Sequence, residues 1–212
     1  MRIAGLVWIV AGASALIAAG CATYPDPAAT RGIAEKMVSE AFTAPSPALL
    51  QRLEQDKAQQ LCSKIGGAAL TQEEAAEVVK LARASIQYPA SGKLVGDWKV
   101  GNKLAHDGAG DRIQGGMLEK RKENGGLCQN CHALAPGEIN VGNLGPSLTG
   151  YGRQRGNSEA IAKLTYERIY NGWAYVPCSN MPRLGATRHL TPDQIAHLVA
   201  YLIDPASPIN SR

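Results

Sequence analysis

The chain has 212 residues, which is enough for one domain with a well-buried core and an extension beside it. Hydrophobic residues make up 45% of the sequence and charged residues 19%, as in ordinary soluble domains, and the formal net charge is only +4. Because no block of basic residues interleaved with aromatics is present, the composition excludes nucleic-acid binding as the function.

The first 21 residues differ in composition from the rest of the chain. Arg2 precedes an apolar stretch that runs to Ala19, and this pattern predicts an export signal over residues 1–21. The last four residues of the signal resemble a lipobox, the cleavage site at which Cys21 would receive a lipid, although Ala stands where Leu is usual. Ordinary cleavage one residue further on is the alternative. Either way we expect a periplasmic protein, and a lipid on Cys21 would tether it to a membrane.

Residues 22–96 are predicted to form a helical extension. A short tether rich in Ala, Pro and Thr comes first. Periodicity and capping signals then predict three helices: one over Thr30–Phe42, one that begins at Pro47 after the N-cap Ser46 and ends at Gly66-Gly67, and one that begins with a Thr71/Glu74 capping box. The Pro- and Gly-containing break at 88–96 marks the predicted end of the extension.

Residues 97–205 are predicted to form the main domain. Further helices are expected after the N-cap Asp97, over Ser158–Tyr170, and after Thr191, where Pro192 and Gln194 complete a capping box. Two stretches rich in Gly, 106–126 and 133–157, are expected to be loops. Since no repeat and no convincing strand pairing is present, the sequence predicts an all-α fold.

The main domain contains the pattern Cys128-x-x-Cys131-His132. This spacing lets two sulfurs reach the vinyl groups on one side of a porphyrin, while the adjoining His supplies an imidazole to the iron, so it predicts one covalently attached haem c. A zinc site would need a second group of Cys or His ligands nearby. A redox-active cysteine pair would not require the His, and it usually accompanies a βαβ pattern that is absent here.

The second axial ligand of the iron is predicted to be Met181. Most methionines fill hydrophobic cores, but Met181 lies between Pro177 and Pro182 in a segment too irregular for a helix. A loop held by two prolines can present a thioether at small entropic cost. His189 is the main rival, and the remaining candidates are Met37, Met117, His106 and His197.

A haem iron with His132 and Met181 as firm ligands would have no open position for a substrate. Such an iron changes charge by one with little rearrangement, and Met ligation raises its potential relative to two His ligands. The sequence therefore predicts transfer of single electrons.

Two cysteines remain once Cys21, Cys128 and Cys131 are assigned to lipid and haem. In an oxidising compartment we expect Cys62 and Cys178 to form a disulfide, and two separate free cysteines are the alternative.

Four segments of the chain resemble SoxX, the mono-haem subunit of the SoxAX cytochrome of bacterial thiosulfate oxidation. The segments are Gly96–Lys99, Gly125–His132, Asn143–Leu148 and Tyr170–Arg183, and the likeness covers about residues 88–204. The most specific part surrounds Met181. Residues 24–87 extend beyond the minimal family domain.

The resemblance implies a class I cytochrome c fold with Cys128, Cys131, His132 and Met181 as the haem ligands. By the same likeness, the carbonyl of Pro146 is expected to accept the N–H of His132, although a plain turn is the simpler interpretation. It implies a heterodimer with a SoxA-type cytochrome, which carries the catalytic haem and couples thiosulfate to the carrier SoxYZ, as in a cysteine S-thiosulfotransferase. Electrons would then pass to a small acceptor cytochrome.

Two other functions stay open from the sequence. The chain could be a stand-alone class I cytochrome c that shuttles electrons to an oxidase. It could also be a haem enzyme, such as a peroxidase, in which Met181 leaves the iron. A cluster of basic residues between 153 and 188, Arg183 among them, is expected to be solvated or to form a rim that steers an acidic partner.

Overall fold

The computed structural model describes residues 26–41, 47–64, 69–114, 117–139 and 141–211. The predicted signal over residues 1–21, the lipidation site Cys21 and the predicted cap Ser46 lie outside these ranges. The chain divides into two compact units, Met1–Thr43 and Ala44–Arg212. Among the described residues, no helix is both long and apolar enough to span a membrane.

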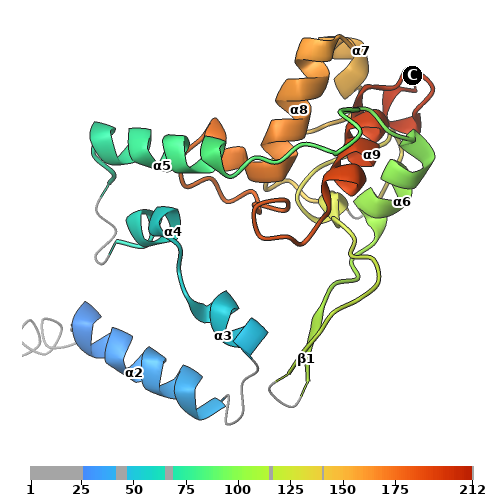
Figure 1. Cartoon of the computed structure of the whole chain (residues 1–212). Coiled ribbons are helices and arrows are strands. Elements are labelled where there is room, and N and C mark those ends of the chain that lie inside the picture. The colour runs from blue at the N-terminus through green and yellow to red at the C-terminus, as the bar shows by residue number, and fades with distance from the viewer. Residues whose placement is uncertain (1–25, 42–46, 65–68, 115–116, 140, 212) are drawn as a thin grey trace, which may run out of the picture. The chain divides into compact units, whose positions relative to one another are not determined.

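The described part of the first unit is helix α2 (Pro27–Ala41), which contains most of the predicted helix over 30–42 (Figure 1). Asp26 begins it by accepting the amide of Ala28 at 3.1 Å. Two exposed ion pairs one turn apart, Arg31–Glu35 and Lys36–Glu40, run along its surface.

The second unit is mostly helical, in agreement with the predicted all-α class. Its helices are α3 (Pro47–Leu53), α4 (Lys57–Cys62), α5 (Gln72–Ala84), α6 (Trp98–His106), α7 (Tyr151–Arg155), α8 (Glu159–Asn171) and α9 (Pro192–Ile203), with the 3₁₀ turns η1 (Cys128–Asn130), η2 (Gly172–Ala174) and η3 (Pro208–Asn210).

One antiparallel hairpin departs from the expectation that the chain lacks paired strands. Strand β1 (Arg112–Gln114) pairs with β2 (Met117–Glu119), with Ile113 opposite Leu118. In the sequence, two glycines separate two three-residue segments that each contain an apolar residue, which is the pattern of a short hairpin. The loop predicted over 106–126 therefore contains a small ribbon.

Four predicted helix starts, at the N-caps Thr71, Asp97, Ser158 and Thr191, are confirmed, and side-chain caps explain them. In α5 the Thr71 hydroxyl accepts the amide of Glu74 at 3.2 Å, and the Glu74 carboxylate accepts the amide of Thr71 at 2.9 Å. The same reciprocal arrangement begins α9. The side chains of Asp97 and Ser158 cap α6 and α8.

The single helix predicted from Pro47 to Gly66 is wrong, because the structure has two shorter helices there. Asp56 accepts the amide of Gln59 at 2.8 Å, and the Gln59 side chain accepts the amide of Asp56 at 3.0 Å. This second capping box starts α4 afresh and ends the run of α3. Helix α4 is therefore a separate element from α3.

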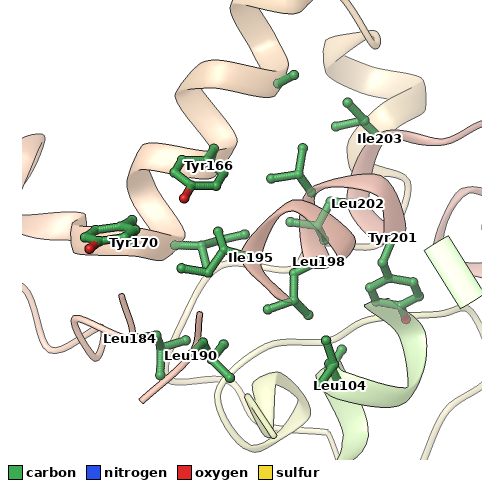
Figure 2. Close-up of a cluster of buried hydrophobic side chains, with 14 of the residues drawn as sticks. Leu104, Tyr166, Tyr170, Leu184, Leu190, Ile195, Leu198, Tyr201, Leu202 and Ile203 are labelled. Atoms are coloured by element: carbon green, nitrogen blue, oxygen red, sulfur yellow. The ribbon is translucent and has the colours of Figure 1, made fainter. Parts of the chain in front are cut away.

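The hydrophobic core lies between α6, α8 and α9. Helix α9 packs against both of the others, and its residues Ile195 and Val199 are fully buried. Figure 2 shows Tyr166 of α8, Leu198 of α9 and Leu104 of α6 in the same cluster. Burial of such side chains stabilises the fold by about 1.5–3 kcal/mol each relative to exposure.

Packing continues across the predicted domain boundaries at 96 and 205. On the N-terminal side, Leu94 packs on the core and the amide of Gly96 donates to the carbonyl of Ala196 at 2.9 Å. On the C-terminal side, Ile209 in η3 is fully buried. The segments that flank residues 97–205 therefore complete the core.

Candidate haem site

The Cys-x-x-Cys-His segment folds into one tight turn. Leu127 precedes it with a φ of +43°, in the left-handed region, and η1 follows. The amide of His132 donates to the carbonyl of Cys128 at 2.9 Å, which closes the turn. Cys128 and Cys131 are both free thiols within it. The two sulfurs and the imidazole are therefore held within a five-residue segment.

The imidazole of His132 is held by the segment that contains Pro146. Its Nδ1 lies 2.7 Å from the carbonyl oxygen of Pro146, which is the contact that the resemblance implied. Because a carbonyl only accepts, Nδ1 carries the proton, and Nε2 keeps the lone pair that a metal requires. The backbone of Gly145 lies so close to the ring that a Cβ there would come within 2.3 Å of Cε1 of His132.

The surroundings of the Cys128 thiol differ from those of a redox-active cysteine or a zinc ligand. The pKa of the Cys128 thiol is raised to about 11, chiefly because the thiol is buried, with a backbone hydrogen bond that lowers it and a smaller contribution from Cys131 that raises it. A redox-active cysteine pair needs the opposite shift, because the thiolate is its nucleophile. Among the described residues, no three His, Cys, Asp or Glu side chains gather as a structural zinc site requires.

Of the predicted methionine candidates, Met181 is the one that is partly buried. It is half-buried and packs on the core cluster, as Cys128 and Leu148 also do. Met37 and Met117 are 65% and 60% exposed. The sulfur of Met181 would lie 3.8 Å from a Cβ on Gly172, so η2 forms one wall beside it.

The three rival histidines are engaged elsewhere. Nε2 of His189 donates to the carbonyl of Gly125 at 2.9 Å. Nδ1 of His197 accepts the amide of Asp97 at 2.8 Å, and His106 contacts Glu138 through Nε2 at 3.0 Å. Because Nε2 of His189 donates, its Nδ1 keeps the lone pair, and the preference for Met181 over His189 stays a prediction.

The structure confirms the disulfide predicted between Cys62 and Cys178. The two Cα atoms are 5.5 Å apart, and the bridge joins residues 116 positions apart in the sequence. It links the C-terminal end of α4 to the loop that carries Met181. Cys178 has a φ of +58°, so the backbone turns sharply at the bridge.

Two residues of this loop were not singled out as site residues in the sequence. Trp173 donates its indole N–H to the carbonyl of Ser179 at 2.7 Å. Arg183 stacks over the Trp173 ring at 4.4 Å and pairs with Asp56 at 2.8 Å. The Arg183 side chain is only 10% exposed, so it is not part of a solvated rim. Its partners lie far away in the sequence, and no local signal indicates them.

The residues present fit a covalently attached haem. Two unpaired thiols and an oriented imidazole come from one turn, and a half-buried thioether comes from a braced loop. Thioether and imidazole are ligands suited to haem iron.

Comparison with known proteins gives one clear relative. The chain is 45% identical over 165 residues to a protein of Aquifex aeolicus (strain VF5) described as an uncharacterized lipoprotein, and the match covers 74% of this chain and 73% of the relative. The chain belongs to the family of this lipoprotein. No protein-family model matches the chain. At this identity we expect members of the lipoprotein family to share the fold described above.

Proposed function

We propose that the chain is a mono-haem c-type cytochrome in which Cys128 and Cys131 hold the haem and His132 and Met181 bind the iron. The observation that carries the proposal is the 2.7 Å contact between His132 Nδ1 and the Pro146 carbonyl, next to a Cys-x-x-Cys turn. It orients the ring so that a neutral Nε2 is the ligand atom. The bound haem supplies a one-electron change at its iron.

The class I cytochrome c fold is the proposed architecture of the main domain. In support of it, α6 and α9 pack closely, and the cysteine motif follows α6 in sequence and contacts it. The thioether segment comes just before α9. This order places the two axial ligands on separate segments that the core joins.

The residues of the site are suited to relaying electrons rather than to breaking bonds. Pro146 and Gly145 hold the imidazole in one orientation, and the core supports Met181 on the other segment. A site with two firm ligands needs little rearrangement when the charge at its centre changes. It also leaves no position for oxygen, peroxide or substrate.

Within electron transfer, the proposed role is that of the SoxX subunit. The chain would pair with a SoxA-type cytochrome, which carries the catalytic haem and joins thiosulfate to SoxYZ, and would pass the electrons to a small acceptor cytochrome. Support comes from the resemblance around residues 170–183, the same loop that holds Trp173, Cys178 and Met181 together. A stand-alone periplasmic cytochrome that serves an oxidase is the alternative.

The proposed location is the periplasm, with a lipid on Cys21 that tethers the protein to a membrane. The sequence of residues 1–21 supports export. The name of the relative from Aquifex aeolicus, a lipoprotein, agrees with the lipidation site.

Covalent haem attachment is the first test. The full chain should be produced in a host that carries out c-type haem maturation, and the haem should stay with the polypeptide after denaturation. Cys128→Ser combined with Cys131→Ser should release it. The matched control, Cys62→Ser combined with Cys178→Ser, should keep it. A wild-type chain without bound haem in that host contradicts the proposal.

The axial ligand is tested by Met181→Ala. We expect loss of the charge-transfer band that marks a Met–iron bond and a marked fall in reduction potential, with the haem still attached. The control Met117→Ala changes an exposed methionine and should alter neither. An unchanged ferric spectrum in Met181→Ala would show that another residue is the ligand.

The partner is tested by purification of the tagged protein from its own cells. Recovery with a second cytochrome of the SoxA kind supports the SoxX role, whereas a monomer free of partners supports the stand-alone shuttle.

A further inference from the structure

The loop that carries Met181 is tied to the helical extension at two points. The Cys62–Cys178 disulfide joins it to the C-terminal end of α4. Asp56, the N-cap of α4, pairs with Arg183 at 2.8 Å. The two ties flank Met181 in sequence, one three residues before it and the other two residues after it. Both ends of α4 are therefore fastened to residues 175–183, here termed the Met loop.

A chain of contacts through Trp173 of η2 connects these ties to Met181. Arg183 stacks on Trp173 at 4.4 Å, and the Trp173 indole donates to the Ser179 carbonyl at 2.7 Å. The Ser179 hydroxyl in turn accepts the amide of Met181 at 3.2 Å. A displacement of Arg183 would therefore change the position of the Met181 backbone.

Helix α5 supports η2, which lies beside Met181. The wall beside the Met181 sulfur is η2, and α5 packs against η2. Arg83 of α5 donates to the carbonyl of Ala174 at 3.3 Å. The side chain of Asn171, which is 1% exposed, donates to the hydroxyl of Ser85 at 2.9 Å. The extension thus braces both the loop and the wall that confine the thioether.

We propose that α4 and α5 form a positioning element for Met181, in which the Cys62–Cys178 bridge and the Asp56–Arg183 pair keep the Met loop closed. This inference rests on the proposed function, in which Met181 is an iron ligand. A thioether is a weak ligand, so its bound fraction depends on how rarely its loop opens. Cross-links made by the extension restrict that opening, and Cys62, Cys178, Arg183 and Asp56 act through the loop rather than on the iron.

The test measures how fast the Met loop opens in the haem-loaded full chain. Cyanide is added to the ferric protein, and loss of the Met–iron charge-transfer band is followed until the rate no longer depends on cyanide concentration. That limiting rate is the rate at which Met181 leaves. The variants are Cys62→Ser/Cys178→Ser, which removes the bridge without leaving a thiol, and Arg183→Gln, which keeps the bridge.

We expect the limiting rate to rise about tenfold or more without the bridge and about threefold in Arg183→Gln. Arg52→Gln is the matched control, because it breaks another ion pair of the same extension, with Asp111 at 2.6 Å, outside the Met loop. Its rate should stay within about twofold of the wild type. Amide hydrogen exchange should rise in residues 175–183 in the same two variants only.

A wild-type protein with the band, together with wild-type rates in both variants, overturns the positioning role and leaves the proposed function intact. A wild-type protein without the band overturns the ligand assignment and the positioning role together. Equal acceleration in Arg52→Gln would also overturn the inference, because the effect would then be general loosening of the extension.

Discussion

Glu167 of α8 connects two segments that are distant in the sequence. Its carboxylate accepts the hydroxyls of both Tyr88 and Tyr175, and Lys163 lies at 4.0 Å. Tyr88 belongs to the segment that leads into α6, and Tyr175 belongs to the Met loop. Burial, followed by the hydrogen bond to Glu167, raises the pKa of each tyrosine to about 12.

Because these two tyrosines have raised pKa values, we expect the protein to lose stability at alkaline pH. A tyrosine with a raised pKa binds its proton more tightly in the folded state than in the unfolded state. Its stabilising contribution is complete below the ordinary pKa of 10 and is lost as the pH rises to about 12. We expect the unfolding free energy to fall over that range, and less steeply in Tyr175→Phe. Denaturant titrations at both ends of this pH range measure the change in unfolding free energy. An identical loss in the wild type and in Tyr175→Phe would contradict the raised pKa of Tyr175 as its cause.

At the residue scale, the sequence indicated the candidate ligands, the Pro146 contact and the disulfide, but not the contacts of Arg183. Cys128, Cys131 and His132 are neighbours in the chain, so their relation depends on one turn and can be read locally. Arg183 and Asp56 are 127 positions apart. Their pairing depends on where α4 lies in the folded chain, so the sequence indicated only a charged residue on a solvated surface.

At the element scale, local chemistry decided where most helices begin. A capping residue satisfies backbone N–H groups in the first turn of its helix. The N-caps Thr71 and Thr191 could therefore be predicted from the sequence alone. The close packing of α6 against α9 could not be predicted in this way. Gly101 of α6 contacts α9, which lies far along the chain. A Cβ there would lie 2.0 Å from the carbonyl oxygen of His197.

The helix crossing predicts that Gly101→Ala destabilises the protein by about 1–3 kcal/mol through overpacking. The two helices cannot move apart without exposing Leu104 and Leu198, so relief of the overpacking would itself cost free energy. Chemical denaturation of the wild type and the variant measures the difference. Gly32→Ala is the control, since a Cβ at that helical position meets nothing within 4 Å and should cost no stability. Equal effects at the two glycines would rule out close packing as the cause.

At the scale of the second unit, the part of the extension from residue 44 onward and the main domain fold together. The disulfide joins residues 116 positions apart, and the residues that pack on the core run from Ile86 to Ile209. Cross-linking so long a loop restricts the unfolded chain more than the folded one.

We therefore expect Cys62→Ser/Cys178→Ser to lower the unfolding free energy by about 4–5 kcal/mol in the chain-entropy account. Denaturant unfolding of the haem-loaded protein, with the slope compared between the two forms, measures the effect. A loss below about 1 kcal/mol would mean that non-covalent contacts hold α4 in place without help from the bridge.

The sequence by itself determined the features whose physics is local: the helix caps, the Cys-x-x-Cys-His turn and the predominance of helix. It also indicated the disulfide, because few cysteines remained to pair. Only the tertiary structure decided the break between α3 and α4, the contact surface at Gly101 and the relay from Asp56 through Arg183 to the Met loop. Those features arise between segments that meet only when the chain is folded, and their free energy depends on distances that no local pattern encodes.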